Sequence, residues 1–297
     1  MDIVVFGAGS LGSVIGGLLA RRHDVTLVGR EPHVSAVAES GLEIHGEIAE
    51  RGRPDARTDP PASADLAVVT VKAGDTAAAA DALATCDLDS CLSLQNGMGN
   101  EATLAEGVDC PVLAGTCTYG ARLAGPGVVE CTGVGEIVLG PREGGESTAA
   151  DRVGEAVADS DIETTVADDM PTRLWAKLAV NAGINATTAL ARVPNGALVD
   201  GPAERVAARA ARETAAVARR EGIDLTDERA TDLARTVASD TAANTASMRQ
   251  DVQAGRRTEI DAINGYVVDH AGDLSVPVNE TLAALVRAWE SEHTGDK

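Results

Sequence analysis

Lysine is nearly absent from this chain of 297 residues. Only three of its 25 basic residues are lysine, namely Lys72, Lys177 and Lys297. Lys72 and Lys177 each lie against an apolar segment, although charged side chains are mostly exposed in proteins. Because the pKa of an ammonium group shifts readily on burial, these two lysines are the first candidates for chemistry. The alternative is that both reach solvent along their aliphatic stems.

Aromatic residues make up only 2% of the chain, so the core must be aliphatic. No apolar run reaches the ~18 residues that a membrane helix needs, and no basic region followed by an apolar one opens the sequence. The five cysteines lack C-x-x-C spacing and the five histidines lack an i, i+4 pair, which argues against a disulfide framework and a metal site. These absences indicate a cytoplasmic protein with reduced thiols, no metal and no membrane partner.

Basic residues are also few, since 25 Lys and Arg stand against 46 Asp and Glu, which gives a formal net charge of −21. Such a surface repels a phosphate backbone, so no nucleic-acid partner is expected. An acidic, lysine-poor and alanine-rich composition is typical of proteins from salt-adapted cells, in which salt screens the self-repulsion. We therefore expect a halophilic protein that is stable and active in molar KCl and loses structure at low salt. A circular-dichroism spectrum that stays the same in dilute buffer would contradict this expectation.

The first half of the chain alternates short apolar runs with helical periodicity. Strands are expected at 2–6, 25–28, 66–71, 91–94 and 112–115, and helices at 10–22 and 76–84. This βαβ rhythm implies a parallel sheet covered on both faces. Segments 127–131 and 135–139 are expected to form strands of a small antiparallel addition.

From about Asp168 the periodicity becomes helical. Helices are expected at 170–190, 203–221, 226–254, 258–270 and 279–290, and Gly222, Gly255 and Gly272 fit helix ends. The predicted fold class is α/β, with an N-terminal doubly wound (Rossmann-type) parallel sheet and a C-terminal all-α domain. We assign residues 1–168 to a dinucleotide-binding domain and residues 169–297 to a helical substrate and dimerisation domain.

The loop after the first strand has the sequence Gly7-Ala8-Gly9-Ser10-Leu11-Gly12. It matches G-x-G-x-x-G in the strand–loop–helix context that a dinucleotide-binding motif requires. In that motif Gly7 makes the tight turn, Gly9 lets the backbone approach a pyrophosphate, and Gly12 lets the helix pack closely on the strand. The N-terminus of the helix then favours phosphate. The alternative is a glycine-rich turn that binds nothing.

The end of the second strand indicates which dinucleotide is bound. NAD-binding proteins usually place an acidic residue about 20 residues after the glycines, where it holds the ribose 2′-OH. This chain has Arg30 at that place, and a guanidinium suits a 2′-phosphate. The neighbouring Glu31 could instead serve a ribose hydroxyl. The sequence favours NADP(H) over NAD(H) as the cofactor.

Polar residues recur at helical spacing in the second half. Lys177, Asn181 and Asn185 stand at i, i+4 and i+8, so they share one face of an otherwise apolar helix. A buried polar stripe needs partners or a ligand, and structural hydrogen bonding is the alternative to substrate binding.

A second stripe is formed by Asn244, Ser247 and Asp251 at i, i+3 and i+7, for which an exposed helix surface is the alternative. Glu259 opens a later helix, where the helix dipole alone would also favour a carboxylate. Together with the first stripe, these residues are the candidates for binding a small polar substrate.

Seven segments, in order along nearly the whole chain, resemble the ketopantoate reductase (2-dehydropantoate 2-reductase) family. They are 7–12, 71–73, 95–99, 174–181, 194–196, 247–251 and 258–265. The Asn-Gly-Met-Gly, Trp-x-Lys-Leu-x-x-Asn and Thr-Glu-Ile-Asp-x-Ile-Asn-Gly motifs within them are together specific. The resemblance implies NADPH-dependent reduction of 2-dehydropantoate to (R)-pantoate, on the route to pantothenate and coenzyme A. A homodimer is the assembly that it suggests.

The resemblance also implies roles for individual residues. The family's catalytic lysine falls on Lys177 and its partner carboxylate on Glu259. Its cofactor-binding residues fall on the glycine loop and Lys72. Its substrate-binding residues fall on Asn181, Asn185, Asn244 and Ser247, and Asn96 matches the asparagine that meets both cofactor and substrate. No role is transferred to Tyr119, where the family often has histidine.

Two other functions fit the same residues. One is a related NAD(P)-dependent reductase of another small 2-keto acid, since one fold supports several substrates. The other belongs to a different class, a redox sensor that binds NADP(H) without turnover. An assay of NADPH oxidation with a panel of keto acids would separate the three.

Overall fold

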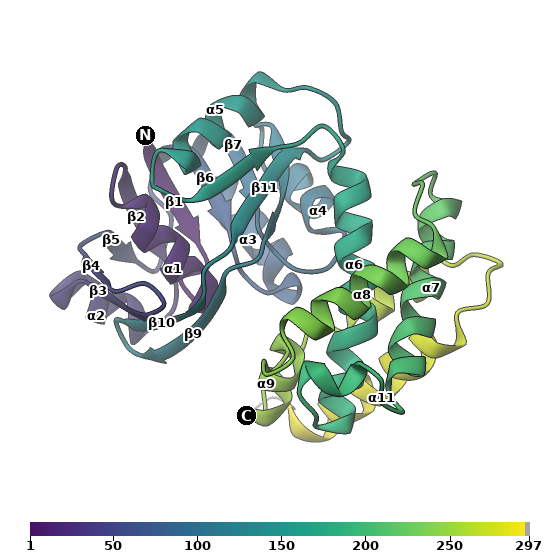
Figure 1. The fold of residues 1–297 in the computed structure, drawn as a ribbon. Coiled ribbons are helices and arrows are strands. Elements are labelled where there is room, and N and C mark those ends of the chain that lie inside the picture. The colour runs from purple at the N-terminus through teal and green to yellow at the C-terminus, as the bar shows by residue number, and fades with distance from the viewer. Residues whose placement is uncertain (295–297) are drawn as a thin grey trace. The chain divides into compact units, whose positions relative to one another are not determined.

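The computed structural model of the protein describes residues 1–294, so the third lysine, Lys297, lies outside the described residues. By its internal contacts the chain divides into two units (Figure 1). Unit 1 comprises Met1–Gln95 and Asn100–Met170, and unit 2 comprises Asn96–Gly99 and the chain from Pro171 onward. The short segment 96–99 therefore belongs to the second unit, although the flanking residues belong to the first.

Unit 1 is built on an eight-stranded sheet. Its strand order is β12-β11-β8-β7-β6-β1-β2-β5. The strands are β1 (Asp2–Phe6), β2 (Asp24–Val28), β5 (Asp55–Arg57), β6 (Ser63–Val69), β7 (Asp87–Ser93), β8 (Val112–Cys117), β11 (Glu136–Pro141) and β12 (Glu163–Val166). All neighbours are parallel except β8 and β11. The chain leaves β1 toward β2 and later returns to β6 on the other side, so the strand order reverses at β1. In sheets of this kind, ligands bind at the carboxyl ends of the strands beside such a reversal.

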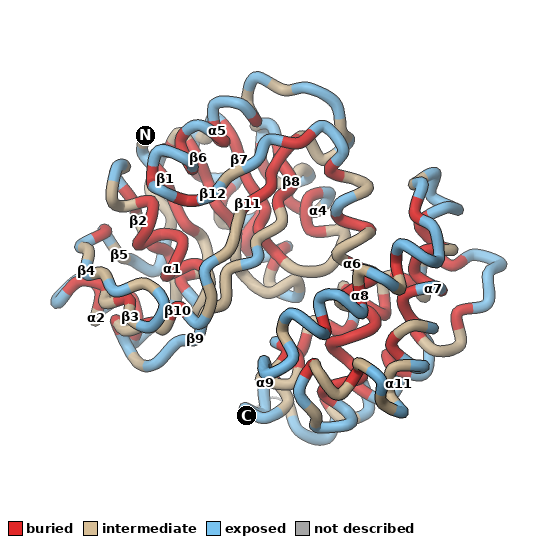
Figure 2. The backbone as a smooth tube through the Cα atoms, viewed as in Figure 1, coloured by how far each residue is buried: buried red, intermediate tan, exposed pale blue. Residues whose placement is uncertain are grey.

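Helices cover both faces of this sheet, as predicted. The unit's helices are α1 (Ser10–Leu19), α2 (His33–Ser40), α3 (Thr76–Leu83), α4 (Asn100–Gly107) and α5 (Thr148–Ala158). Along β1, Ile3 and Val5 pack with α1, α2 and α5, whereas Val4 packs with α3 and α4 on the other face. This alternation buries both faces of the strand, and Figure 2 shows the buried stretches of β1 and β6.

A second, four-stranded sheet has the order β4-β3-β10-β9. Its strands are β3 (Leu42–Gly46), β4 (Glu50–Gly52), β9 (Gly120–Gly125) and β10 (Val128–Gly133). The expected pair of antiparallel strands at 127–131 and 135–139 is only half right. Residues 128–133 pair antiparallel with β9, but residues 136–141 form β11 of the main sheet. The reason is burial, since Ile137 and Leu139 are fully buried in the main core.

Unit 2 is helical, so the predicted fold class is confirmed. Its α-helices are α6 (Met170–Ala191), α7 (Glu204–Arg220), α8 (Asp227–Asp240), α9 (Ser247–Gln253), α10 (Tyr266–Asp269) and α11 (Pro277–His293), with a 3₁₀ turn η2 (Asn195–Leu198) and a π-helical turn η3 (Asp261–Gly265). Its main core is rich in alanine. At Gly183 on α6, a methyl group would lie 2.8 Å from the carbonyl oxygen of Ala207 on α7, so these two helices approach closely.

The single helix expected over 226–254 is wrong, because the chain leaves the helix after Asp240 and resumes it at Ser247. Contacts from η2 explain the break. The N–H of Asn195 donates to the Asn244 carbonyl at 3.2 Å, and the N–H of Gly196 donates to the Ala242 carbonyl at 3.0 Å. These carbonyls would otherwise accept hydrogen bonds within a continuing helix. Asn244 therefore lies in a turn and not on a helical stripe with Ser247 and Asp251.

The helix expected from 258 starts later, at Asp261, and starts as a π turn. The N–H of Gly265 bonds to the Ile260 carbonyl at 2.9 Å, five residues back. Ahead of it, Glu290 of α11 accepts the N–H of Thr258 at 2.6 Å. A carboxylate from another helix thus holds the turn that carries Glu259, so Glu259 precedes the helix and does not open it.

No helix within residues 1–294 is long and apolar enough to cross a membrane. Within the same range no two cysteines form a disulfide. The described residues also contain no group of three or more His, Cys, Asp or Glu side chains that could hold a metal ion.

Candidate active site

The glycine loop of unit 1 has the shape that its motif predicts. Gly7 has a φ of 115°, and a methyl group there would lie 2.6 Å from the backbone nitrogen of Val71. A methyl group on Gly12 would lie 2.5 Å from the Thr70 Oγ1, which itself donates to the Gly7 carbonyl at 2.9 Å. Two of the glycines are therefore required by the packing of β6 against the loop and α1.

Gly9 differs, because it is exposed and a methyl group there would have only the Gly7 carbonyl within reach, at 3.8 Å. It is also the N-cap residue of α1, and it carries no side chain that would accept the first-turn N–H groups. The first-turn N–H groups of α1 therefore receive no side-chain cap from Gly9. N–H groups at the N-terminus of a helix can donate hydrogen bonds to a pyrophosphate. Ser10 Oγ accepts the N–H of Leu123 from β9, so this serine side chain serves the fold.

Arg30 follows the end of β2, where the sequence places it, and lies at the surface. Its guanidinium forms an ion pair with Asp75 at 2.9 Å, and the two side chains are 86% and 47% exposed. Glu31 is turned to a different partner, since its carboxylate accepts the Ser35 hydroxyl at 2.7 Å. Asp75 had no part in the sequence-based site.

Lys72 lies partly buried in the turn after β6. A buried polar network holds this turn. Gln95 Nε2 donates to the Val71 carbonyl at 3.1 Å and to Thr76 Oγ1 at 2.7 Å, and Thr76 Oγ1 also lies 2.8 Å from Asn100 Oδ1. Because Thr76 lies about twenty residues before Gln95 and Asn100, no spacing in the sequence could reveal this support.

Helix α1 is tied to its surroundings through His33. The His33 Nδ1 accepts the N–H of Gly127 at 3.1 Å, so the Nε2 carries the hydrogen and donates to Ser13 Oγ at 2.9 Å. Burial lowers the pKa of His33, although a backbone hydrogen bond to Gly125 opposes the shift. The imidazole is therefore held neutral between α1 and the β9–β10 turn.

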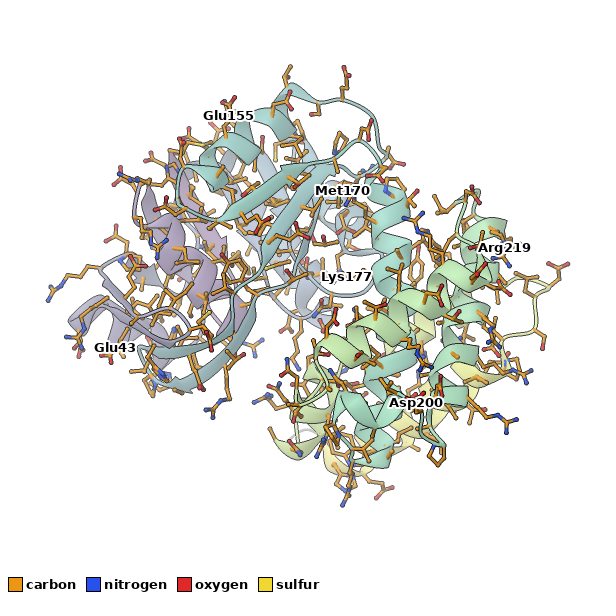
Figure 3. The ribbon with its side chains drawn as sticks, viewed as in Figure 1. Glu43, Glu155, Met170, Lys177, Asp200 and Arg219 are labelled. Carbon is orange, nitrogen blue, oxygen red and sulfur yellow. The ribbon has the colours of Figure 1, made fainter. Side chains whose placement is uncertain are left out.

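In unit 2, helix α6 runs unbroken through Lys177, Asn181 and Asn185, so the predicted spacing places them on one face. Lys177 is labelled on α6 in Figure 3. Lys177 and Asn181 are partly buried and Asn185 is 6% exposed. A polar row of this kind within an apolar helix can bind a small ligand that carries a carboxylate and a hydroxyl group.

Asn96 and Glu259 come together in unit 2. The Asn96 Nδ2 lies 3.5 Å from a Glu259 carboxylate oxygen. The N–H of Met98 donates to the Ala262 carbonyl at 3.0 Å, and Gly97, with a φ of 83°, packs against the same residue. The segment 96–99 is thus fastened to the turn that Glu290 holds. Glu290 is a supporting residue that the sequence did not indicate.

Asn244 and Ser247 are exposed and precede or begin α9. The sequence did not assign a site role to Asn195, which lies beside them. It is 6% exposed, its Nδ2 donates to Thr241 Oγ1 at 2.9 Å, and its buried Oδ1 has no hydrogen-bond partner within residues 1–294. A buried amide with an unused acceptor at this turn is a further candidate for contact with a ligand.

Both halves of the chain match one known protein family. The ketopantoate reductase PanE/ApbA family matches residues 3–144, and the C-terminal domain of that family matches residues 169–290. The 2-dehydropantoate 2-reductase of Halobacterium salinarum is 46% identical, and the match covers 97% of this chain and 98% of that protein.

Two solved structures share the whole fold. The PanE/ApbA family ketopantoate reductase from Ralstonia eutropha matches with a TM-score of 0.91 and 34% identity, over 99% of this chain and 100% of that chain. A D-mandelate dehydrogenase, solved with NADH and anilino(oxo)acetate, matches with a TM-score of 0.93 and 25% identity over 100% of both chains.

A doubly wound sheet with a glycine loop after β1, where the strand order reverses, followed by a helical unit, defines a dinucleotide-binding type of α/β protein. Within that class, the chain belongs to the ketopantoate reductase family, which includes the oxidoreductase 2-dehydropantoate 2-reductase of Halobacterium salinarum. The resemblance stated from the sequence motifs is thereby confirmed.

Proposed function

We propose that the protein reduces 2-dehydropantoate to (R)-pantoate with NADPH, a step toward pantothenate and coenzyme A. The observation that carries this proposal is the end-to-end match to a 2-dehydropantoate 2-reductase at 46% identity. Residues 1–168 would form the dinucleotide-binding domain and residues 169–297 the substrate domain. The substrate is a small molecule with a carboxylate, a keto group and a hydroxyl group, which suits the polar row on α6.

The residues of unit 1 fit a bound NADP(H). The open backbone at Gly9 and the N-terminus of α1 suit the pyrophosphate, and the exposed Arg30 suits a 2′-phosphate. Lys72 adds a second cation that follows the carboxyl end of β6. The cofactor, when bound, supplies the hydride that reduces the keto carbon.

The residues of unit 2 then handle the charge that develops. Reduction of a ketone leaves an alkoxide, and Lys177 stabilises that oxygen and gives it a proton as general acid. Glu259 binds the substrate hydroxyl or keeps Lys177 charged, and Asn96 orients substrate beside it.

The substrate carboxylate needs hydrogen-bond donors. In this proposal they are the amides of Asn181, Asn185 and Asn244 and the hydroxyl of Ser247. These contacts fix the keto group relative to Lys177, which lowers the entropic cost of the reaction.

The first test is the oxidation of NADPH with 2-dehydropantoate in molar KCl, run beside NADH. Lys177→Ala should lower kcat by about 10²-fold or more, because a general acid contributes about that factor. Lys72→Ala is the matched control, since it removes the other described lysine and should raise the NADPH KM more than it lowers kcat. Near-normal turnover by Lys177→Ala would show that the wrong residue was chosen.

Cofactor choice is tested separately at Arg30. Arg30→Ala should raise the KM for NADPH much more than the KM for NADH, because only NADPH has the 2′-phosphate. Equal effects on the two cofactors would remove Arg30 from the proposal.

A second candidate function is reduction of a different small 2-keto acid. It is favoured by the match to D-mandelate dehydrogenase, whose solved complex holds NADH and anilino(oxo)acetate. A panel of keto acids, each assayed with NADPH and NADH, decides between the two. Binding of NADPH with no oxidation by any of them would instead support the redox sensor.

The proposed enzyme also has a location, an assembly and a salt requirement that follow from the sequence. They are a cytoplasmic location, a homodimer and a requirement for molar salt. Sedimentation in molar KCl tests the dimer, and circular dichroism at falling KCl concentration tests the salt requirement.

A further inference from the structure

The ion pair between Arg30 and Asp75 joins the segments that follow β2 and β6, the two neighbours of β1 in the sheet. In the sheet, β1 stands between β2 and β6, with Phe6 opposite both Val28 and Val69. Arg30 comes two residues after Val28, and Asp75 comes six residues after Val69. Because parallel strands end at the same edge, a bond between these side chains spans the carboxyl end of β1, where the glycine loop begins.

Both ends of this ion pair are held by the backbone. Gly29, just before Arg30, donates its N–H to the Arg57 carbonyl at 3.1 Å. On the other side the Asp75 N–H donates to the Lys72 carbonyl at 2.8 Å. The backbone of both residues is thus held, and the Asp75 carboxylate places a negative charge beside the guanidinium. The neighbouring acidic residue after β2, Glu31, accepts from Ser35 instead.

We infer that Asp75 is a specificity-determining residue that acts against the 2′-phosphate of NADPH. This inference rests on the proposed function, in which Arg30 meets that phosphate. A 2′-phosphate that approaches Arg30 must displace the Asp75 carboxylate or lie close to it, and two anions near one guanidinium repel each other. A ribose 2′-OH brings no charge and can donate to a carboxylate. Asp75 thus weakens NADPH binding and leaves NADH binding almost unaffected.

The test is Asp75→Asn, with binding measured directly by the fluorescence of NADPH and NADH. The pair is exposed and contributes little to stability, so the variant is expected to fold. Its Kd for NADPH should fall about fivefold, within the range of energies measured for exposed ion pairs. Its Kd for NADH should change less than about twofold, since no phosphate charge is relieved.

Two controls separate the local effect from net charge. Asp81→Asn makes the same charge change on the exposed surface of α3 and should leave both Kd values unchanged. In the Arg30→Ala background, Asp75→Asn should lose most of its gain, because the two residues act as a pair. The gain should also shrink between the lowest KCl concentration at which the protein is folded and 3 M KCl, because salt screens charge repulsion.

Unchanged or weaker NADPH binding by Asp75→Asn would overturn the inference, and so would an equal gain from Asp81→Asn. Those results would leave the proposed reaction in place. Failure of the unmodified protein to bind either dinucleotide would be a different result, since it would remove the proposed function together with the inference.

Discussion

In unit 1 the candidate residues follow the carboxyl ends of parallel strands, whereas in unit 2 they lie along one long helix and in the turns between other helices. The strand ends are fixed by the register of the sheet and by glycines with no room for a side chain. Two segments of unit 2 are held by single buried carboxylates. Glu290 accepts the N–H of Thr258, and Glu213 accepts the N–H groups of Val278 and Asn279.

This difference shows where each unit is sensitive to change. In unit 1 the glycine loop is held by close contacts with neighbouring backbone, so a methyl group added at Gly7 or Gly12 should lower stability more than the loss of one side chain. In unit 2 these two segments depend on single polar side chains, so removal of Glu213 leaves several N–H groups without their acceptor. The following predictions test that contrast.

The largest effect on stability is expected from Glu213→Ala in unit 2. The Glu213 carboxylate accepts the N–H of Val278, the N–H of Asn279 and the Asn279 Nδ2, all within 3.2 Å, and so caps α11. Its loss should lower the free energy of unfolding by about 3 kcal/mol, because hydrogen bonds to buried charged groups are costly to break. Glu213→Gln keeps one acceptor oxygen and should cost about a third of that.

Urea unfolding at constant KCl gives both values. While folded, both variants should keep the NADPH affinity of the unmodified protein, because the glycine loop belongs to unit 1. Equal stability of Glu213→Ala and the unmodified protein would contradict the role assigned to this carboxylate.

A matched pair of substitutions tests the glycine loop. Gly12→Ala should lower the free energy of unfolding by about 2 kcal/mol, because the new methyl group would overlap Thr70 and the loop backbone. Gly9→Ala should leave stability unchanged, since a methyl group fits there, but it should weaken NADPH binding at the pyrophosphate. Thermal unfolding and fluorescence titration measure the two effects. Equal stability loss in both variants would contradict the assigned geometry.

The smallest effect concerns pH. Burial lowers the folded-state pKa of His33 below its ordinary value of 6.5, so the unfolded chain binds a proton at higher pH than the folded protein does. The stability linked to His33 is therefore complete above pH 6.5 and is lost as the pH falls from 6.5 toward the folded pKa. His33→Asn should flatten the dependence of the unfolding free energy on pH between 8 and 5.5 by about 1 kcal/mol at most.

His45→Asn, on the partly exposed β3, is the control for the loss of a histidine. An unfolding free energy that depends on pH equally in His33→Asn and in the unmodified protein would assign the effect to other groups.

The features that the sequence predicted correctly have local signals. An apolar run that ends at Phe6 and is followed by three spaced glycines determines a strand and a loop without help from the rest of the chain. The face shared by Lys177 and Asn185 likewise depends only on the period of one helix. The site roles of Lys72 and Glu259 come from the family resemblance alone and stay predictions, because no local pattern would assign them.

The features that the sequence missed are set by distant contacts. The helix expected over 226–254 is interrupted because Asn195 and Gly196, more than forty residues away, bind carbonyl groups at 242–244. The pairing of Arg30 with Asp75 depends on the order of three strands, and the hydrogen bond from Gln95 to the Val71 carbonyl depends on the next strand. These contacts can be recognised only after the topology is known.

The close approach at Gly183 has a consequence for how this family could change its substrates. Gly183 lies two residues from both Asn181 and Asn185, so it faces roughly the opposite side of α6 from them. A larger residue there, or at the facing Ala207, would push α6 sideways together with every polar group it carries. If the proposed function holds, selection for a bulkier substrate can act on the contact between α6 and α7 while Lys177, Asn181 and Asn185 keep their identity.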